Sequence, residues 1–309
     1  MKKFAIAIHG GAGTILRSQM SDDKEKQYKS ALEEAVHNSY EILFHDGTAL
    51  DAVEQAVVIL EDCPLFNAGK GSVFTHEGRH EMDASIMDGL RKDGGAVSLL
   101  RNIKNPIKLA RLVLERSEHV LLAGEGAEIF AKEQGIEFAD PEYFYDELRH
   151  NQLLSALSSN KVILDHTEID PKKFGTVGAV ALDKNGNLAA ATSTGGMTNK
   201  KWGRIGDTPI LGAGTYANNE SCAVSCTGSG EYFIRSVAAF NIHSLMIYAR
   251  MNLSDACYKV IHEILPSIGG DGGLIAIDKH GNFCLDFNTE GMYRAFLSSH
   301  DQKIIGIYK

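Results

Sequence analysis

The sequence has little of what marks secreted, membrane-spanning or disulfide-rich proteins. Its 309 residues include five cysteines, an odd number with no C-x-x-C pair, and only six prolines. A disulfide framework is therefore not expected, and a reduced cytoplasmic setting is the simplest explanation. The apolar run near the N-terminus, residues 4–8, is too short for a signal peptide or a membrane span.

Basic residues are also scarce. The chain has 31 lysines and arginines against 40 aspartates and glutamates, a formal net charge of −9, and no dense basic cluster. A nucleic acid or an anionic membrane lacks the positive surface that it needs, so a small polar ligand is the better expectation. Hydrophobic residues at 44% and charged residues at 23% are ordinary values for a globular protein with a large core.

Glycine, by contrast, is abundant. The 31 glycines gather in short clusters, which mark places where the backbone bends sharply or comes close to another group. The clusters lie at residues 10–13, 69–71, 94–95, 195–196, 228–230 and 269–273.

Cap and turn signals divide the first half of the chain into strands and helices. Residues 4–8 are predicted to form a buried strand, and residues 72–100 have the alternation and turn signals of strands. Helices are predicted to begin at Ser21 as N-cap, at Thr48, and at the Asn105-Pro106 pair. Helical patterns then continue to about residue 158.

The second half is richer in hairpin signals. About residues 160–175 lose periodicity and gain charge and a proline, which predicts an exposed linker. Hairpins are predicted at residues 177–194 and 273–288, each around a D-K-x-G-N turn. Helices are predicted between them, at about 230–249 and from Ser254 as N-cap to about 265. This order favours a sandwich of sheets covered by helices over a parallel βαβ fold.

Two short motifs allow a functional and a structural interpretation. H-E-G-R-H at residues 76–80 has the spacing of a zinc peptidase, in which a helix places both histidines on one face. Here Gly78 stands at the centre between strand-like flanks, so a surface turn that points His76 and His80 apart is favoured. H-G-G-A-G at residues 9–13 resembles an esterase oxyanion loop, but no G-x-S-x-G serine elbow accompanies it, and a turn that ends the strand is favoured.

The Gly175-Thr176 pair stands between the predicted linker and the first hairpin. A threonine hydroxyl is a poor nucleophile unless a base takes its proton, and a chain that begins at the threonine supplies its own α-amine as that base. The reference pKa of such an amine, about 7.7–8.0, leaves a sizeable neutral fraction near neutral pH. Glycine permits the strained backbone from which the hydroxyl attacks its own preceding carbonyl. A plain strand start explains the pair equally well.

Three further segments supply complementary groups. Thr194 ends the partner strand of the first hairpin, so pairing brings it near Thr176. Arg204 and Asp207 stand in a glycine-bounded loop, and together they suit the zwitterion of an amino acid, although a surface ion pair is the plain alternative. C-T-G-S-G at residues 226–230 precedes a predicted helix, where it offers an oxyanion hole or simply a helix N-cap.

Together, these residues resemble, in order and almost from end to end, the plant-type asparaginase and isoaspartyl aminopeptidase family of N-terminal nucleophile hydrolases. The likeness is greatest to bacterial isoaspartyl peptidases. It is carried by H-G-G-A-G (9–13), L-F-N-A-G-K-G-S-V-F (65–74), M-D-A-S-I-M-D-G (82–89), N-P-I-K-L-A-R-L-V (105–113), G-T-V-G-A-V-A-L-D (175–183), A-T-S-T-G-G (191–196), G-R-I-G-D (203–207), G-A-G-T-Y-A (212–217) and F-N-T-E-G-M-Y-R-A (287–295).

The resemblance implies a fold and an activity. The fold is an α+β, αββα sandwich of two mainly antiparallel sheets between helical layers, a single domain over residues 1–309. The family makes it as an inactive precursor that cuts itself into an α subunit, residues 1–175, and a β subunit, residues 176–309. Two such pairs usually form a dimer. The implied activity is hydrolysis of L-asparagine and of β-aspartyl dipeptides, without a catalytic cofactor.

Catalytic roles follow from the same resemblance. Cleavage between Gly175 and Thr176 would make Thr176 the nucleophile and its freed amine the base. Thr194 and Asn67 would orient its hydroxyl. Thr227 and the N–H of Gly228 would stabilise the tetrahedral oxyanion beside the bound substrate.

The resemblance also implies binding residues. Arg204 would grip the α-carboxylate of the substrate, and Asp207 with the Gly230 carbonyl would hold its α-ammonium. Family members bind a structural sodium ion through backbone carbonyls, here those of Leu60, Glu61, Cys63, Phe66, Ala68 and Lys70.

Two alternatives stay open at this point. One is a non-enzymatic amino-acid-binding protein that uses Arg204 and Asp207. The other is a zinc peptidase built on His76 and His80. Both predict a chain that stays uncut.

Overall fold

The computed structural model describes residues 2–158, 175–300 and 302–309. Of the linker predicted at about residues 160–175, all but the final glycine lies outside the described residues. The helices are α1 (Asp22–Phe44), α2 (Ala49–Asp62), α3 (Pro106–Arg116), α4 (Gly124–Glu133), α5 (Pro141–Phe144), α6 (Glu147–Ser158), α7 (Gly230–Ser236), α8 (Ala238–Tyr248), α9 (Leu253–Tyr258) and α10 (Leu265–Ser267). Short 3-10 segments span Arg17–Gln19 and Gly69–Gly71, and a π-helical segment spans Lys259–Ile264.

The strands fall into two sheets, which pack face to face. They are β1 (Ala5–Gly13), β2 (Met82–Asp88), β3 (Asp93–Leu100), β4 (Leu121–Ala123), β5 (Val177–Leu182), β6 (Leu188–Thr194), β7 (Thr215–Ala217), β8 (Cys222–Gly228), β9 (Gly272–Asp278), β10 (Phe283–Phe287), β11 (Gly291–Ser298) and β12 (Lys303–Tyr308). Within the described ranges, one sheet has the order β12-β11-β1-β5-β6-β2-β3-β4 and the other β10-β9-β8-β7. The β3–β4 pair is parallel, and the other pairs are antiparallel.

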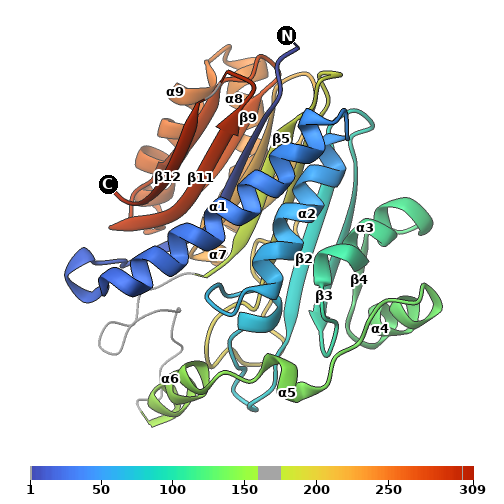
Figure 1. Ribbon diagram of the computed structural model, residues 1–309, viewed down its shortest axis with the longest axis vertical. Coiled ribbons are helices and arrows are strands. Elements are labelled where there is room, and N and C mark those ends of the chain that lie inside the picture. The colour runs from blue at the N-terminus through green and yellow to red at the C-terminus, as the bar shows by residue number, and fades with distance from the viewer. Residues whose placement is uncertain (1, 159–174, 301) are drawn as a thin grey trace.

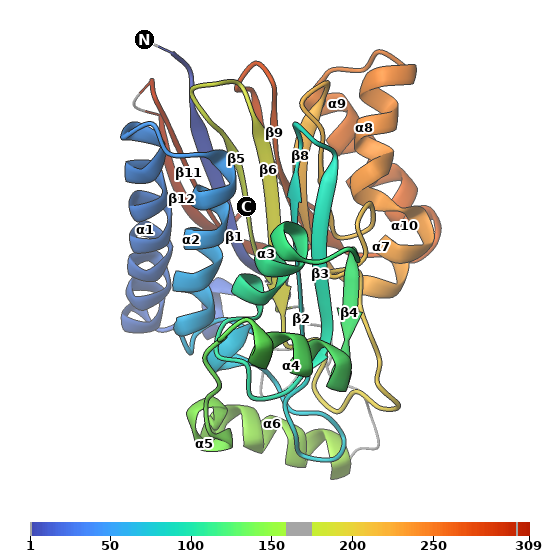
Figure 2. The ribbon, with the colours of Figure 1, turned by 90° about the vertical axis from the view of Figure 1, so that its right-hand side faces the viewer.

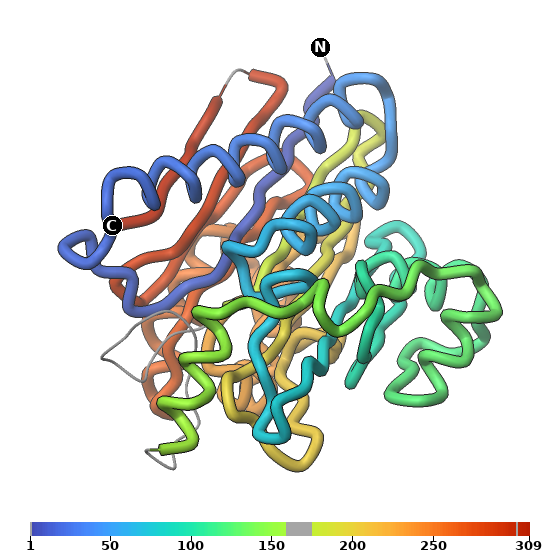
Figure 3. The backbone as a smooth tube through the Cα atoms, turned by 60° about the horizontal axis from the view of Figure 1, so that its bottom comes forward, coloured from blue at the N-terminus to red at the C-terminus, as the bar shows by residue number. Residues whose placement is uncertain are grey.

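Helices cover both outer faces of this pair of sheets. Figure 2 shows α1, α2 and α3 on the side of the larger sheet, and α7, α8 and α10 on the side of the smaller one. Figure 1 gives the view onto the α1 and α2 layer, and in Figure 3 the first helix runs beside the last strands of the chain. The predicted αββα sandwich is confirmed. In the described part of the chain, none of the helices has the length and apolar character that a membrane crossing requires.

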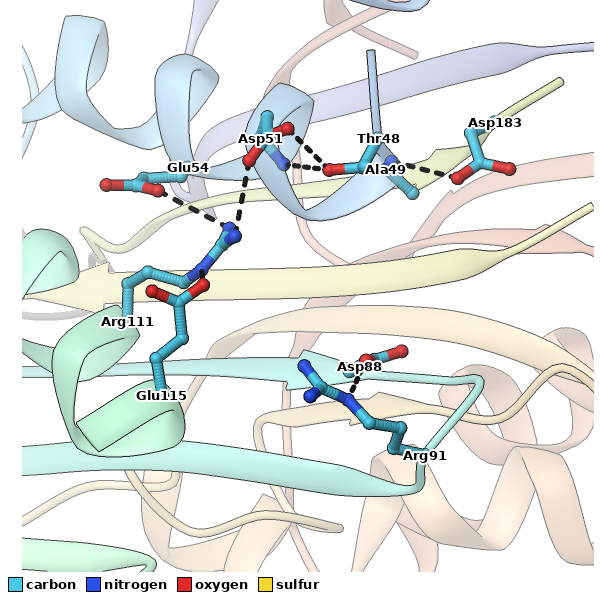
Figure 4. A network of polar contacts seen from close by, with 9 residues as sticks. All are labelled: Thr48, Ala49, Asp51, Glu54, Asp88, Arg91, Arg111, Glu115 and Asp183. Atoms are coloured by element: carbon cyan, nitrogen blue, oxygen red, sulfur yellow. Dashed lines mark hydrogen bonds and ion pairs between the residues drawn. The ribbon is translucent and has the colours of Figure 1, made fainter. Parts of the chain in front are cut away.

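The predicted helix starts are confirmed by their caps. The Ser21 side chain accepts the Lys24 N–H (3.3 Å), and the Thr48 side chain accepts the Asp51 N–H (3.1 Å). Proline follows Asn105 at the first position of α3, where its missing N–H costs no intrahelical bond. Arg111 of α3 joins that helix to α2 through ion pairs (Figure 4).

The H-G-G-A-G segment differs from its prediction. Strand β1 does not turn away at His9 but continues to Gly13, with a register shift between His9 and Ala12. Pairing with the neighbouring strand β11 resumes after this shift, because Ala12 pairs with Met292 and Gly13 with Gly291. Such a bulge redirects side chains without ending the strand.

Helix boundaries in the C-terminal half differ in detail. The N-cap of α9 is Asn252, whose side chain accepts the Asp255 N–H (2.9 Å), and Ser254 lies inside the helix. The stretch predicted at 230–249 is broken at Val237, which has φ +48°. Helices α7 and α8 are therefore separate elements.

Candidate active site

A small pocket lies where Gly175 and Thr176 enter strand β5. Its volume is about 10 Å³, which in the intact chain leaves room for a water-sized group but not for an amino acid. Most of the predicted catalytic and substrate-binding residues line it, whereas Thr227, Gly230 and Asn67 are not among the lining residues. The lining residues are Gly175, Thr176, Thr194, Gly196, Met197, Arg204, Gly206, Asp207, Thr208 and Gly228.

The carbonyl oxygen of Gly175 is held by two donors. Asn67 Nδ2 and Thr194 Oγ1 each donate a hydrogen bond to it over 2.9 Å. The Asn67 amide is itself fixed, because Nδ2 also donates to Gly196 O (2.7 Å) and Oδ1 accepts the Val73 N–H (3.0 Å). Two preorganised donors at one carbonyl are what a tetrahedral intermediate needs when its oxygen gains negative charge.

The Thr176 hydroxyl, which is 7% exposed with the rest of its residue, contacts Thr194. Thr176 Oγ1 donates a hydrogen bond to Thr194 Oγ1 over 3.2 Å, and Thr194 Oγ1 in turn donates one to the Gly175 carbonyl oxygen. Asn67 reaches that carbonyl and not the Thr176 hydroxyl. Among the described residues, the hydroxyl therefore has one side-chain partner, and a hydrogen-bonded path leads from it through Thr194 to the oxygen of the preceding peptide.

The predicted oxyanion residues lie on strand β8 beside the pocket. Gly228 lines the pocket, and a Cβ there would come within 2.5 Å of Asp271 O and of the Phe233 ring, so only glycine fits. Thr227 is fully buried, and its Oγ1 accepts the Ala12 N–H from the β1 bulge over 3.3 Å. The bulge thus supports the Thr227 hydroxyl, whose own proton is left for another acceptor.

Asp207 presents a buried carboxylate to the same pocket. The residue is 5% exposed, and its Oδ2 has no hydrogen-bond partner among the described residues. Burial raises the pKa of Asp207 to about 7, against the opposing positive charge of Arg204. An unpartnered buried oxygen of this kind suits a cationic ligand, because an ammonium would supply both the missing charge and the missing donors.

Arg204 already has a carboxylate partner in the structure. Its Nε and one terminal nitrogen donate to the two oxygens of Glu231 over 2.9 and 3.0 Å. Gly230 allows this approach, because a Cβ there would lie 2.8 Å from Asp207 Oδ1 and 2.9 Å from Arg204 Nη2. Sequence reasoning missed Glu231, although an acidic residue in the first turn of the predicted helix was a usable signal.

The H-E-G-R-H motif forms a turn, as predicted, although His80 at its end is buried rather than at the surface. Gly78 has φ +71°, and the Thr75 N–H donates to Arg79 O over 2.7 Å. His76 Nδ1 contacts Asn199 Oδ1 (2.7 Å), whereas His80 Nδ1 contacts Ser72 Oγ (3.0 Å). The two rings therefore serve different neighbours, which is not the arrangement of two zinc ligands on one helix face.

The loop after α2 brings backbone carbonyls together. A Cβ at Gly71 would lie 2.1 Å from Phe66 O and 2.7 Å from Pro64 O, and one at Gly69 would lie 2.5 Å from Glu61 O. The last turn of α2 adds carbonyls that have no intrahelical partner and lie at the negative end of the helix. Hard cations prefer oxygen ligands, and Glu61 and Phe66 are two of the six residues predicted to bind sodium.

Sequence reasoning also missed His9 as a neighbour of the site. Its ring is fully buried, and His9 Nδ1 lies 3.1 Å from the carbonyl oxygen of Thr176. Met197, Gly206 and Thr208 likewise line the pocket without having been predicted. His9 and Gly206 stand in the H-G-G-A-G and G-R-I-G-D motifs, but neither motif shows which atoms these two residues face, because that depends on strand register and loop packing.

Comparison with known proteins finds similarity over nearly the whole chain. A family model described as Asparaginase matches residues 2–307. The chain is 54% identical over 312 residues to an isoaspartyl peptidase of Salmonella typhimurium, with both proteins fully covered, and 54% identical to one of Escherichia coli, covering all of this chain and 97% of that protein. An isoaspartyl peptidase/L-asparaginase of Xenopus laevis is 43% identical over 306 residues, which are 99% of this chain and 96% of that protein. The chain therefore belongs to the asparaginase family.

Proposed function

We propose that this protein is a self-processing threonine hydrolase that releases aspartate from L-asparagine and from β-aspartyl dipeptides. The observation that carries the proposal is the arrangement around Gly175-Thr176: a hydroxyl, a twice hydrogen-bonded carbonyl and a pocket with Arg204 and Asp207. The relatives that are named isoaspartyl peptidase and L-asparaginase support the same activity.

The first step is cleavage of the chain itself. The Thr176 hydroxyl attacks the Gly175 carbonyl carbon, and the oxygen that gains charge is held by Asn67 and Thr194. The peptide bond then breaks as its nitrogen takes the proton that the attacking hydroxyl gives up, which leaves an ester between Gly175 and the Thr176 side chain. Water hydrolyses that ester to give a Gly175 carboxylate and a free α-amine on Thr176. Departure of the Gly175 end enlarges the pocket for a substrate.

The second step is substrate hydrolysis. The freed amine takes the Thr176 hydroxyl proton as the oxygen attacks the side-chain carbonyl of the aspartyl group. Thr227 and the Gly228 N–H stabilise the oxyanion, and collapse expels ammonia or an amino acid with its proton. Water then hydrolyses the β-aspartyl ester and regenerates Thr176.

Recognition rests on the aspartyl head of the substrate. Asp207 binds its α-ammonium together with the Gly230 carbonyl, and Arg204 binds its α-carboxylate, either beside Glu231 or in its place. Because these groups all contact the head, the leaving group can vary. This explains why an amidase and a dipeptidase activity can share one site.

We extend the proposal to the assembly and its ion. The α and β subunits, residues 1–175 and 176–309, form one domain, and two such pairs form a dimer in the cytoplasm, a setting consistent with five free cysteines in the described residues. A structural sodium ion bound by the carbonyls of the loop after α2 would shape the Asn67 segment without entering the reaction. The sodium ligands would be the carbonyls of Leu60, Glu61, Cys63, Phe66, Ala68 and Lys70.

Intact-mass analysis of the purified protein tests the central event. Two chains divided between residues 175 and 176 are expected, together with asparaginase and β-aspartyl dipeptidase activity. Thr176→Ala should remain one chain and lose both activities. An uncut chain with full activity, or an active Thr176→Ala variant, would refute the proposal, and an uncut chain that binds amino acids without turnover would favour the binding-protein alternative.

A further inference from the structure

A row of buried polar side chains lies between the two sheets, directly behind Thr176. Strand register places His9 opposite Gly178, Gly178 opposite Thr192, and Thr192 opposite Ser85, so these positions share one face of the larger sheet. Thr215 and Ser225 are paired in the same way on the smaller sheet. All five side chains are fully buried.

Hydrogen bonds connect these side chains into one chain. His9 Nε2 lies 2.9 Å from Ser225 Oγ, which lies 2.7 Å from Thr192 Oγ1. Thr215 Oγ1 donates to Thr192 Oγ1 over 2.6 Å, and Ser85 Oγ lies 2.7 Å from Thr215 Oγ1. Because the buried cluster between the sheets otherwise consists of apolar residues that range from alanine to phenylalanine, this polar row is a local exception that needs an explanation.

The direction of these bonds follows from the end that touches Thr176. The Thr176 carbonyl can only accept, so His9 Nδ1 must carry the proton (3.1 Å). Burial lowers the pKa of His9 to about 3, although that carbonyl contact opposes the shift, and the ring is therefore neutral. Its Nε2 is then an acceptor, so Ser225 donates to His9, and Thr192 donates to Ser225.

The other end of the row reaches the substrate-binding loop. Ser85 Oγ lies 2.6 Å from the carbonyl oxygen of Thr208, and Thr215 Oγ1 lies 3.3 Å from the same oxygen. Thr208 lines the pocket and follows Asp207 in the chain. The row thus lies between the backbone of the nucleophile and the backbone beside the ammonium-binding carboxylate. Because Ser85 has one hydroxyl proton, it donates either to Thr208 O or to Thr215 Oγ1, and the bond directions near His9 do not depend on which.

Gly178 makes this contact between the sheets possible. A Cβ at that position would lie 2.0 Å from Ser225 Oγ and 2.5 Å from His9 Nε2. The absence of a side chain on β5 lets Ser225 of the opposite sheet reach His9. Glycine at position 178 therefore leaves the room that the Ser225–His9 hydrogen bond needs, in an otherwise regular buried strand.

We propose that His9 is a positioning residue for Thr176, and that the row of Ser225, Thr192, Thr215 and Ser85 holds its imidazole in the tautomer that donates to the Thr176 carbonyl. The inference rests on the proposed function. After cleavage, residue 176 is a chain end with no peptide bond before it, so its carbonyl is the backbone group nearest to the reacting amine and hydroxyl. A fixed donor there keeps both groups in the attacking geometry.

Two substitutions at position 9 separate hydrogen bonding from space filling. The His9→Asn amide can place a donor where Nδ1 stood, whereas the His9→Gln amide reaches the Nε2 position and leaves the Thr176 carbonyl without its donor. We expect kcat of His9→Asn within about tenfold of the unmodified enzyme and kcat of His9→Gln lower by a further factor of roughly one hundred. KM should stay nearly constant, because neither change touches Arg204 or Asp207.

Maturation is followed in the same samples. The fraction of cut chains is measured by intact mass, kcat is expressed per cut chain, and if His9→Gln fails to cut, the rates of self-cleavage of the two variants are compared instead. Slower cutting or slower turnover of His9→Gln relative to His9→Asn supports the proposal. Equal behaviour of the two variants, or a loss expressed in KM alone, would overturn it.

Substitutions further along the row test the tautomer argument. Ser225→Ala should lower kcat by roughly tenfold and Thr215→Val by less, with KM unchanged. Ser39→Ala is a matched control, since Ser39 is a fully buried hydroxyl in α1 that donates only to Ala35 O among the described residues. A loss of kcat in Ser39→Ala as large as in Ser225→Ala would show a general effect of removing buried hydroxyls. If Thr176→Ala is inactive but His9→Asn and His9→Gln behave alike, this inference alone is refuted. If Thr176→Ala is active, the proposed function is refuted as well.

Discussion

Two hairpins of this protein have turns of the same sequence pattern but lie in different parts of the two sheets. The β5–β6 turn is D-K-N-G-N from Asp183, and the β9–β10 turn is D-K-H-G-N from Asp278. In each, the aspartate accepts the N–H groups two and four residues later over 2.8 and 2.9 Å. Gly186 and Gly281 have φ of +83° and +80°. The turn chemistry is therefore the same.

The surroundings of the two hairpins are different. Strands β5 and β6 are buried at every position in the middle of the larger sheet, and their open end holds Thr176 and Thr194. Strand β10 is half-buried at the edge of the smaller sheet. The comparison teaches that local sequence specifies the turn, whereas the position in the sheet and the residues at the open end specify the chemistry.

The largest expected contrast lies at the open ends. Thr194→Val removes the hydroxyl that donates to Gly175 O and accepts from Thr176, so self-cleavage should slow by roughly 10²–10³. Thr289→Val, just after β10, removes a buried hydroxyl bonded to Gly291 O (3.0 Å) and should leave cleavage unchanged. A time course of intact mass measures both. Equal cleavage rates in the two variants would break the comparison.

The carboxylates near the two open ends provide the next contrast. Asp207→Asn should lower kcat/KM by roughly tenfold to a hundredfold, because a hydrogen bond to a charged group contributes about 1.5–3 kcal/mol. Asp271→Asn, just before β9, keeps an acceptor for the Ser229 hydroxyl (2.7 Å) and should change kcat/KM little. Steady-state kinetics with L-asparagine decides between them.

The pH dependence sharpens the same contrast. The pKa of Asp207 is about 7, so its carboxyl is neutral below that pH and charged above it. Because only the charged form attracts an ammonium strongly, kcat/KM should rise as pH increases through about 7. Asp207→Asn should lose this rise and keep the one that belongs to the Thr176 amine. A profile that is the same in both proteins would contradict the assignment.

A smaller contrast is expected in stability. Asp183 is 1% exposed and also accepts the Ala49 N–H at the start of α2 (3.2 Å, Figure 4), so Asp183→Ala should lower the free energy of unfolding by about 2–3 kcal/mol. Asp278→Ala, in the edge hairpin, should lower it by about 1–2 kcal/mol. Asp183→Asn keeps the turn acceptor and serves as the control. Urea unfolding measures these changes. An equal shift of the unfolding midpoint in both alanine variants would show that the position in the sheet has no effect on stability.

The smallest effect should be the same in both hairpins. Gly186→Ala and Gly281→Ala each place a Cβ at a positive φ, which costs about 1 kcal/mol, and neither Cβ would come within 3.4 Å of another group. Their unfolding free energies should therefore agree with each other. A clear difference would mean that the two turns are less alike than their hydrogen bonds indicate.

Local signals explain what could be predicted from the sequence. Ser21, Thr48 and the D-K-x-G-N turns act over three or four residues, so the helix starts and both hairpins could be located without the fold. The H-G-G-A-G segment could not be assigned, because its pairing partner β11 lies almost three hundred residues away in the sequence. Asn252 and Ser254 are both acceptable N-caps, and tertiary packing decides between them.

The candidate site divides in the same way. Thr176, Arg204 and Asp207 belong to motifs whose chemistry can be recognised in the sequence. The donors on the Gly175 carbonyl and the contact of His9 with Thr176 depend on register between distant strands. The Arg204–Glu231 pair depends on how closely α7 approaches the loop that carries Arg204. Gly230 permits this approach, but a glycine in the sequence does not predict it.

The strand order of the larger sheet has a consequence for a chain cut once at Thr176. Strand β1 would belong to one product and both of its neighbours, β5 and β11, to the other, while β6 and β2 would join the two products again. Dilution alone could not separate such interlocked pieces, because parting them means tearing a continuous ladder in three places. Once denatured, the halves would have to find each other again at a rate that falls with concentration. Self-cleavage would thus convert a single chain, which can refold without a partner, into a long-lived assembly of two chains that is difficult to reform after denaturation.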